Sequence, residues 1–562
     1  MLTVTARMTS LCDMLRPYAI RRHVLQAVAL ATAAAGIACA GAPPATAPVP
    51  ATGARTGPAR PANATIARAP LPAANPRLPA VPEVDGALSI KVVYPPRNAM
   101  IASRDSNFIF GSVGNGTAGL SINGDLVPVW PNGAFMGWLR NPPADSQWYD
   151  LVAYTLTDTA RLRYPVRTLT AVGPSRTEAR VARLETPLAA TLHDDSLDRS
   201  VSDTDNVIIG RPTPTGDYKW FLFPGTRVRV LEYRDDGDAT MARVQLDEGQ
   251  EIWVARRDVQ DVKTDSVGAV LDTLRVTGAR LAASPASVDL ELHVDSPPAY
   301  VVAEGERDIT LTLYNTVASE DFAPAPDSLI ASATESRQPT RTVYHVVLTR
   351  PVYGYQALYE NGVFKLRIRR PPVVDAAHPL RGMTIVVDPG HPPIGATGPT
   401  GLWEPVPTLA VGLRVRDLLE ARGAHVVMTR TGPAPVALGD RPIMARRANA
   451  NAFVSIHLNA LADGQNPFRD NGTGTYYFHP QSRLLARLVQ ESLVPRLGLR
   501  DRGIFYQNLA VARSTWFPAV LAEGVFIIMP DQEAAIRTPQ YQDAYARGVV
   551  DGLEKFFGTL AR

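Results

Sequence analysis

Cysteine is almost absent from this sequence of 562 residues, and the two that occur, Cys12 and Cys39, both lie near its N-terminus. The rest of the chain therefore has no thiols for a disulfide framework or for a cysteine-based metal site. Any metal ion in the folded domains must be held by histidine and carboxylate side chains, a set of ligands that suits zinc.

An excess of charge of one sign is also lacking. Lys and Arg together number 57, Asp and Glu together number 54, and the formal net charge is +3. Nucleic-acid binding requires a concentrated basic face, so we expect no nucleic-acid partner. The hydrophobic share of 45% and the charged share of 20% are ordinary for a soluble globular protein. A chain of this length is expected to form three or more domains.

The apolar run near the N-terminus, residues 24–38, is too short to span a bilayer. Two arginines precede it, and its length suits the hydrophobic region of a signal peptide. Two interpretations stay open: cleavage at the small residues Ala38-Cys-Ala40, or a lipobox at Gly36-Ile-Ala-Cys39 that lipidates Cys39 and attaches the protein to a membrane. Both predict that residues 1–40 are an export signal and that the protein works in the periplasm or cell envelope.

Composition then separates a linker from several folded regions. Residues 41–84 consist mainly of Ala, Pro, Thr, Gly and Arg, which predicts a disordered, extended tether. Three segments follow in which apolar and polar residues alternate between turn signals, namely 85–175, 176–263 and 264–374. This period of two predicts three all-β modules. The first resembles bacterial immunoglobulin-like modules, and the second resembles a bacterial SH3-like barrel.

The pattern changes over residues 380–560, where apolar strand-like runs alternate with segments of helical spacing. This alternation predicts an α/β domain with a mostly parallel sheet flanked by helices on both faces. The expected strands lie near 382–388, 425–429, 452–456, 475–478 and 518–522. The fold class is therefore three N-terminal all-β modules followed by a C-terminal α/β domain.

Ionisable residues terminate several of these strands. The first ends in Asp388-Pro-Gly-His391, the third continues through His457, and the fifth ends in Glu523; Glu404 follows a glycine-rich loop. A catalytic zinc ion needs three nitrogen or oxygen ligands and a separate carboxylate that moves protons. We expect His391, Glu404 and His457 to be the ligands and Glu523 to be the general base. Structural roles remain as alternatives: a carboxylate at a helix N-terminus for Glu404 and a buried salt bridge for Glu523.

Six pieces of this domain together resemble the catalytic domain of zinc-dependent N-acetylmuramoyl-L-alanine amidases, the type 3 amidases. They are Val387-Asp-Pro-Gly-His391, the loop from Gly395 to Glu404, Val427-Met-Thr-Arg430, Arg447-Ala-Asn449, Phe453-Val-Ser-Ile-His-Leu-Asn459 and Pro518-Ala-Val-Leu-Ala-Glu523. Residues 264–374 resemble the AMIN domain found ahead of such amidases.

The resemblance implies a peptidoglycan hydrolase that cuts the amide between N-acetylmuramic acid and the L-alanine of the stem peptide, in cell-wall remodelling or daughter-cell separation. It assigns Zn2+ to His391, Glu404 and His457, and the catalytic role to Glu523. Three further residues are expected at the site: Asn459 as a hydrogen-bonding group, Asp388 as the partner that orients a ligand imidazole, and Arg502 as a substrate contact.

The sequence departs from the family where two glycines usually follow the first histidine, because Pro392 and Pro393 stand there. Proline fixes φ and removes a backbone donor, so this loop should be stiffer and should alter substrate fit more than zinc binding. Two other functions stay open: a peptidoglycan-binding adaptor that has lost activity, and a zinc peptidase acting within the stem peptide. The stretch 463–471 is polar, and we expect no inhibitory helix there. Whether an envelope protein regulates this chain therefore stays open.

Overall fold

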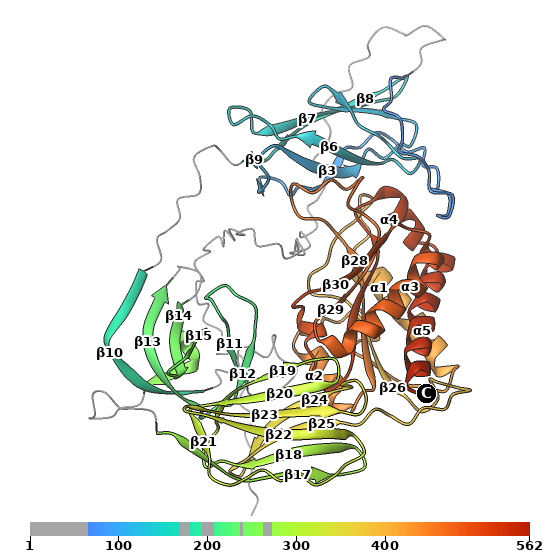
Figure 1. The fold of residues 1–562 in the computed structure, drawn as a ribbon. Helices are drawn as coiled ribbons and strands as arrows, with labels where there is room; N and C mark the ends of the chain where they lie inside the picture. The colour runs from blue at the N-terminus through green and yellow to red at the C-terminus, as the bar shows by residue number, and fades with distance from the viewer. Residues whose placement is uncertain (1–65, 169–179, 194–206, 236–239, 262–271, 562) are drawn as a thin grey trace, which may run out of the picture. The chain divides into compact units, whose positions relative to one another are not determined.

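The computed structural model describes residues 66–168, 180–193, 207–235, 240–261 and 272–561 (Figure 1). The expected export signal, with Cys39, and the first part of the expected linker lie outside the described residues. Among those that are described, no helix is both long enough and apolar enough to cross a membrane.

The second part of the expected linker, residues 66–84, has neither helix nor strand but is held against folded domains. Arg68 donates hydrogen bonds to two carbonyls of the first module, and Asn75 donates to a carbonyl of the C-terminal domain. Leu78 and Val81 pack against a hydrophobic core. The prediction of a disordered tether is thus corrected for this stretch, because composition did not reveal these few anchoring side chains.

The first module consists of two antiparallel sheets, as its alternating pattern predicts. One has the order β1-β3-β6 and the other β5-β4-β7-β8, with a small β2-β9 pair beside them. A core that includes Ile109 and Phe135 fills the module. The strands are β1 Lys91–Tyr94, β2 Met100–Ile101, β3 Ser106–Ser112, β4 Gly119–Ile122, β5 Asp125–Leu126, β6 Ala134–Arg140, β7 Trp148–Tyr154, β8 Thr159–Pro165 and β9 Arg167–Thr168.

The second and third modules are also built from strands. The second has a sheet of order β15-β14-β13-β10-β16 and a β11-β12 pair, and the third has two sheets of order β21-β17-β18-β25-β24 and β19-β20-β23-β22. Strands of the second are β10 Arg180–Leu192, β11 Ile208–Gly210, β12 Trp220–Leu222, β13 Arg227–Asp235, β14 Thr240–Asp247, β15 Gln250–Ala255 and β16 Val259–Asp261. Strands of the third are β17 Leu274–Ala283, β18 Ser287–His293, β19 Ala299–Glu304, β20 Asp308–Tyr314, β21 Thr316–Ala318, β22 Ile330–Gln338, β23 Arg341–Leu348, β24 Tyr355–Glu360 and β25 Val363–Arg369.

The C-terminal domain has a six-stranded sheet of order β27-β26-β28-β31-β29-β30. All neighbouring strands are parallel except β29 and β31, so the sheet is mixed but mostly parallel. The strands are β26 Thr384–Pro389, β27 His425–Met428, β28 Ala452–Asn459, β29 Thr473–Tyr477, β30 Asp501–Tyr506 and β31 Ala519–Phe526. Strand β30 was not expected, because Asp-Arg-Gly at its start interrupts the apolar pattern.

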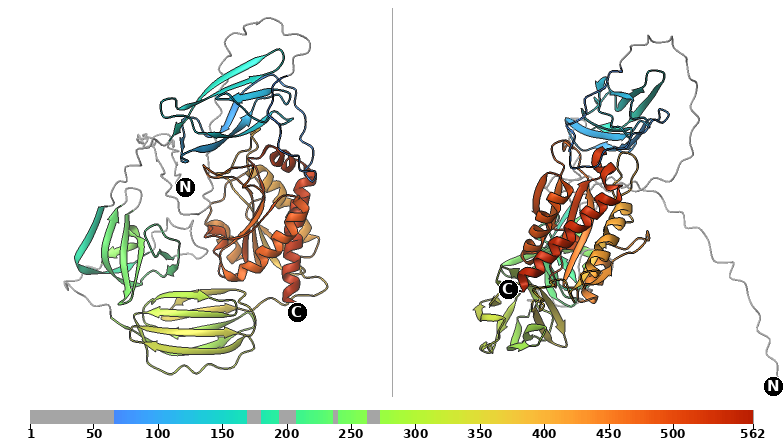
Figure 2. Two further views of the ribbon diagram at one scale, coloured as in Figure 1. Left: turned by 45° about the horizontal axis from the view of Figure 1, so that its top comes forward. Right: turned by 90° about the vertical axis from the view of Figure 1, so that its right-hand side faces the viewer.

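Helices cover both faces of this sheet, as expected (Figure 1 and Figure 2). The long helices α1 Pro405–Glu420, α3 Arg483–Leu497 and α5 Pro539–Leu560 lie on one face, where α5 contacts both α1 and α3. The short α2 Asp440–Arg447 packs on the other, and α4 Pro530–Ile536 follows β31. Ile385 and Val387 join the core under the long helices, whereas Val386 joins the core under α2. Burial on both faces explains why these strands are apolar without alternation.

Candidate metal centre and active site

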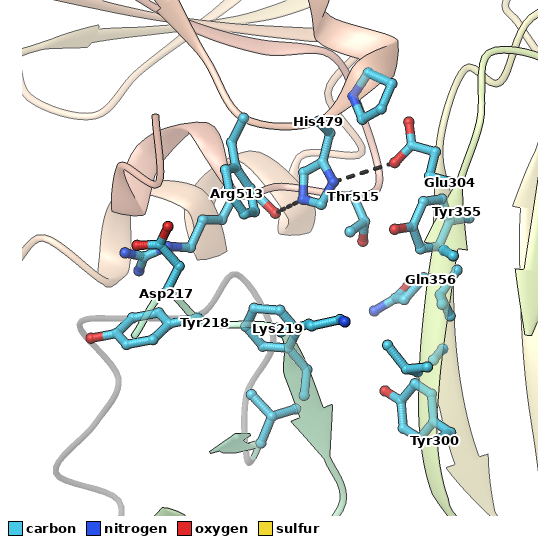
Figure 3. A pocket seen from close by; sticks show the side chains of 18 of the residues that line it. Asp217, Tyr218, Lys219, Tyr300, Glu304, Tyr355, Gln356, His479, Arg513 and Thr515 are labelled. Carbon is cyan, nitrogen blue, oxygen red and sulfur yellow. Dashed lines mark hydrogen bonds and ion pairs between the residues drawn. The ribbon is translucent and has the colours of Figure 1, made fainter. Parts of the chain in front are cut away.

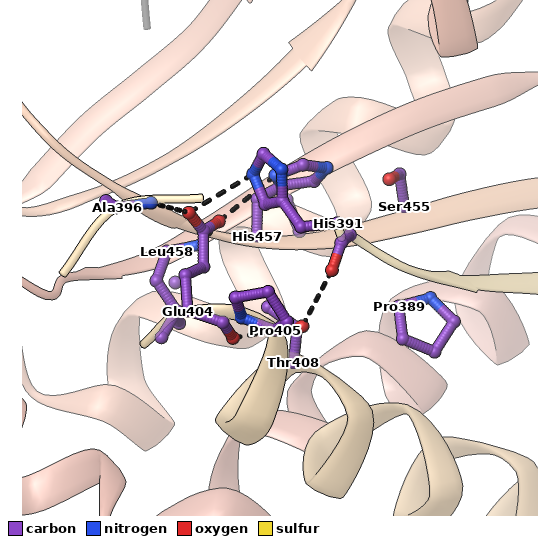
Figure 4. Close-up of polar contacts among 12 residues, drawn as sticks. Pro389, His391, Ala396, Glu404, Pro405, Thr408, Ser455, His457 and Leu458 are labelled. Carbon is purple, nitrogen blue, oxygen red and sulfur yellow. Dashed lines mark hydrogen bonds and ion pairs between the residues drawn. The ribbon is translucent and has the colours of Figure 1, made fainter. Parts of the chain in front are cut away.

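His391, Glu404 and His457 meet at the sheet edge where the parallel strands end (Figure 4). Glu404 Oε2 is 3.1 Å from His391 Nε2, and Glu404 Oε1 is 3.2 Å from His457 Nδ1. One donor atom from each residue lies within 4.8 Å of the other two, and this is the only such group of His, Cys, Asp and Glu side chains among the described residues. The structure thus brings together the three residues that the sequence marked as metal ligands.

Glu404 occupies the N-cap position of α1, and its two carboxylate oxygens are fixed by backbone donors. Oε2 accepts from the N–H of Ala396 at 2.9 Å, and Oε1 accepts from the N–H of Leu458 at 3.0 Å. Burial raises the pKa of Glu404, but its contacts with His391 and His457 outweigh burial and hold that pKa below its ordinary value. Glu404 is therefore a carboxylate at neutral pH, which is the form that binds metal ions.

The two imidazoles also have the properties of ligands. Burial holds the pKa of His457 below its ordinary value, which favours the neutral, metal-binding form. His391 Nε2 is buried and makes no hydrogen bond, although it faces Glu404. His391 also has a φ of 60°, a strained backbone conformation for a residue with a side chain. A buried nitrogen without a hydrogen-bond partner requires an explanation, and a metal ion bound beside Glu404 would supply one.

Gly390 lets the His457 ring lie against the backbone of the neighbouring strand end. A Cβ atom at Gly390 would lie 2.4 Å from His457 Nε2, a distance that requires the ring to move. Gly390→Ala is therefore expected to lower the metal affinity by about tenfold or more, as loss of ligand orientation does elsewhere. Titration of the protein against a chromophoric zinc chelator measures this, and Gly432→Ala, where a Cβ would meet no atom within 4 Å, is the control. Unchanged affinity in Gly390→Ala would contradict the close packing described here.

Glu523 lies in β31 directly beside β28, in register with His457. Its side chain is 3% exposed, and Oε2 makes no hydrogen bond. Burial raises its pKa well above the ordinary value, the nearby Glu404 raises it further, and Arg502 opposes both. A buried carboxyl group with a raised pKa holds a proton more strongly than an exposed glutamate, as a general base requires.

Asp388 forms its hydrogen bonds with side chains other than the two imidazoles. Its carboxylate accepts hydrogen bonds from Thr429 Oγ1, from Ser455 Oγ at 2.6 Å and from Arg441 Nη1 at 2.5 Å, and none of these partners is an imidazole. The charge of Asp388 nevertheless raises the pKa of His457, and the prediction that Asp388 orients a ligand imidazole stays a prediction. Asp388 also holds Arg441, whose Nη2 donates to the carbonyl of His391 at 3.2 Å. Through Arg441, the carboxylate thus holds the backbone of the loop that carries His391.

Asn459 and Arg502, the other two expected site residues, both lie at this edge: Asn459 ends β28 in register with Phe526, and Arg502 lies near the start of β30. The guanidinium carbon of Arg502 lies 5.1 Å from the ring centroid of Phe526. Its charge lowers the pKa of Glu523. Both residues therefore border the candidate catalytic carboxylate.

Sequence reasoning missed the buried charges that hold the loops of the site. Arg430 donates to the carbonyls of Pro389, Gly390 and Pro405 at 2.8 to 3.0 Å, and burial lowers its pKa to about 10. The sequence marked Arg430 only by its presence in one of the recognised motifs, because most of its acceptors are backbone carbonyls, which any residue supplies.

Glu533 of α4 holds the glycine-rich loop that leads to Glu404. Its buried carboxylate accepts from Thr400 N at 3.0 Å, from Thr400 Oγ1 at 2.8 Å and from Leu402 N at 3.1 Å. Glu533→Gln would place an amide donor against these donors, so we expect metal affinity to fall about tenfold. The same chelator competition measures it, with the exposed Glu491→Gln as the matched control. Wild-type affinity in Glu533→Gln would show that Glu404 keeps its place without this anchor.

A separate cavity of about 490 Å³ has none of these residues in its wall (Figure 3). It is lined in part by Tyr300, Tyr355 and His479. His479 Nε2 lies 2.8 Å from the carbonyl oxygen of Arg513 and Nδ1 lies 3.3 Å from Glu304 Oε2. These contacts agree with the sequence-based interpretation of His479 as a structural histidine outside the motifs.

Comparison with known proteins gives a consistent result for the α/β domain. Residues 385–555 match the family model described as N-acetylmuramoyl-L-alanine amidase. The protein YqiI of Bacillus subtilis, whose function is uncharacterised, is 33% identical over 198 residues, which are 34% of this chain and 93% of that protein.

Two named relatives match the same region. A probable cell wall amidase, LytH, of Staphylococcus epidermidis is 35% identical over 188 residues, which are 33% of this chain and 62% of that protein. The N-acetylmuramoyl-L-alanine amidase LytC of Bacillus subtilis is 34% identical over 186 residues, which are 32% of this chain and 36% of that protein. The match to these two relatives thus covers less than two thirds of their length.

Proposed function

Because this chain belongs to the N-acetylmuramoyl-L-alanine amidase family, we propose that it hydrolyses the amide between N-acetylmuramic acid and the L-alanine of the peptidoglycan stem peptide. The observation that carries the proposal is the buried group of His391, Glu404 and His457 with Glu523 in register beside it. Amide hydrolysis needs an activated water and a proton for the leaving amine, and this arrangement can provide both.

We assign Zn2+ to the His391–Glu404–His457 group. Two imidazoles and one carboxylate are the ligand set of several catalytic zinc sites, which leave a further position open. The fit rests on the buried His391 Nε2, which has no hydrogen-bond partner, and on the carboxylate state of Glu404. Bound zinc supplies Lewis acidity toward the water and the scissile carbonyl.

Glu523 performs the proton transfers in this mechanism. Its carboxylate takes the proton of the attacking water and gives it to the nitrogen of L-alanine as the amide bond breaks. Burial and the charge of Glu404 raise its pKa, which makes it a stronger base than an exposed glutamate. Arg502 and Asn459, which lie at the same edge of the sheet, are the proposed substrate contacts beside it.

The segments that precede the catalytic domain are suited to a protein that acts at the cell wall. The apolar N-terminal segment exports the protein to the periplasm or cell envelope, with or without a lipid on Cys39. The immunoglobulin-like, SH3-like and AMIN-like modules precede the catalytic domain and hold the wall or an envelope partner. These assignments rest on sequence resemblance and on the β-structure of the three modules.

The test is digestion of purified sacculi by the full chain, followed by mass spectrometry of the soluble products. We expect stem peptides with a free N-terminal L-alanine. Cleavage within the stem peptide would instead make the protein a zinc peptidase. No release of peptides by protein that contains bound zinc would make it a wall-binding adaptor.

A further inference from the structure

The first β module and the catalytic domain share one hydrophobic core. Phe108, Phe110 and Met136 are each no more than 2% exposed and belong to the same cluster as Ile456 and Phe526 of the catalytic domain. In β3 the intervening Ile109 points to the module's own core instead. Strand β3 is therefore buried on both faces, which is unusual for an antiparallel sheet and shows that the catalytic domain covers one of them.

Several hydrogen bonds across this interface converge on the carboxylate of Asp463. Its Oδ1 accepts from Asn107 Nδ2 at 2.7 Å and forms a short hydrogen bond with the Tyr94 hydroxyl, and its Oδ2 accepts from Ala102 N at 2.7 Å. Asn107 Oδ1 in turn accepts from Gly464 N at 3.1 Å. Both oxygens of the carboxylate are thus paired with donors of the module, and hydrogen bonds to a charged group are the stronger kind.

Asp463 belongs to the loop 460–472, whose two ends adjoin the active site. The loop begins directly after Asn459, two residues beyond His457, and it leads into β29, where Gly474 is in register with Glu523. It is also tied to α4, because Gln532 Nε2 donates to Asn471 Oδ1 at 2.9 Å. A shift of this loop would therefore change the surface beside both His457 and Glu523.

We propose that the first β module is a fixed wall of the active site, in which Tyr94, Ala102 and Asn107 hold Asp463 and so position the 460–472 loop for substrate binding. The inference rests on the proposed amidase function for its substrate. Asp463 is a positioning residue: the hydrogen bonds of its carboxylate go to Tyr94, Ala102 and Asn107, and it acts on the site through the loop. Loss of its contacts should weaken substrate binding and leave the metal centre and proton transfer intact.

Kinetics of Asp463→Asn and Tyr94→Phe on soluble peptidoglycan fragments test the proposal. The asparagine amide would face one of the donors that now bind Asp463, so we expect KM to rise about fivefold or more. We also expect kcat to stay within about twofold and bound zinc to remain at the wild-type level. Tyr154→Phe is the matched control, because its hydroxyl bonds only the carbonyl of Ala67. An unchanged KM in both test variants, or a loss of zinc with a fall in kcat, would overturn the positioning role.

A second experiment tests the docking without any activity measurement. A protease site is placed within residues 169–179 of the full chain, the purified protein is cut, and the fragments are examined by size-exclusion chromatography. We expect the first module to co-elute with the remainder, and Asp463→Ala to weaken this association. Separate elution of the wild-type fragments would overturn the proposal even if amidase activity persisted. If the intact chain proved inactive, co-elution would still establish the docking, so the two failures can be distinguished.

Discussion

Replacing Glu523 with glutamine is expected to slow peptidoglycan cleavage about 10²- to 10⁴-fold, the usual contribution of a positioned proton-transfer group. Glutamine has nearly the same shape, so the metal ligands should keep their places and bound zinc should stay at the wild-type level. Release of stem peptides from sacculi measures the rate, and elemental analysis measures the zinc. Cleavage at the wild-type rate would remove Glu523 from the mechanism.

The same substitution should stabilise the metal-free protein at neutral pH. Glu523 is buried, its Oε2 has no hydrogen-bond partner, and burial raises its pKa well above the ordinary value. A carboxyl group whose pKa is raised on folding costs no stability below its unfolded pKa, and the cost grows as the pH rises toward the folded pKa. Removing a buried group of this kind should add about 1 to 3 kcal/mol to the free energy of unfolding at pH 7.

Urea unfolding of the two metal-free proteins at pH 7 and near pH 4 measures the effect. The difference between wild type and Glu523→Gln should be largest at pH 7 and should shrink toward pH 4, where the carboxyl is protonated in the folded state and mostly protonated in the unfolded state. Glu491→Gln, on the exposed surface of α3, serves as control and should change little. A less stable Glu523→Gln protein at pH 7 would show that the carboxylate has a stabilising partner.

Removal of the metal is expected to abolish cleavage, and Zn2+ should restore it. His457→Ala should abolish activity, and added Zn2+ should not restore it. The substitution deletes one of three protein ligands and leaves Glu404 with one imidazole neighbour. Zinc that binds only the folded state also stabilises that state, by about 4 kcal/mol at a free zinc concentration a thousand times Kd. His457→Ala should lose this gain together with its bound zinc.

Elemental analysis and thermal unfolding, each with and without added zinc, measure these outcomes. His345→Ala is the matched control, because His345 is partly exposed and pairs only with Asp308 at 3.4 Å. The control should bind one zinc ion per chain and melt as the wild type does. If His457→Ala retained zinc at the wild-type level, the ion would be bound elsewhere and the ligand assignment would be wrong.

The sequence predicted the chemistry of the site because strand ends are local features. An apolar strand that finishes in His391 or in Glu523 is visible in a few residues, and parallel strands bring such ends to one edge of a sheet. The family match and the His391–Glu404–His457 geometry agree with that prediction. The β-structure of the three upstream modules was predicted for a similar reason, since alternation with a period of two is also local.

Tertiary structure alone decided how the site is supported. Asp388 bonds Arg441, 53 residues away, and Glu533 holds Thr400, 133 residues away. Asp463 is held by Asn107, 356 residues away, which gives the first module its place beside the catalytic domain. No periodicity links such residues, and their partners are often backbone atoms that every residue carries. The sequence by itself therefore determined which side chains meet at the candidate site, and packing between distant segments determined what holds them in position.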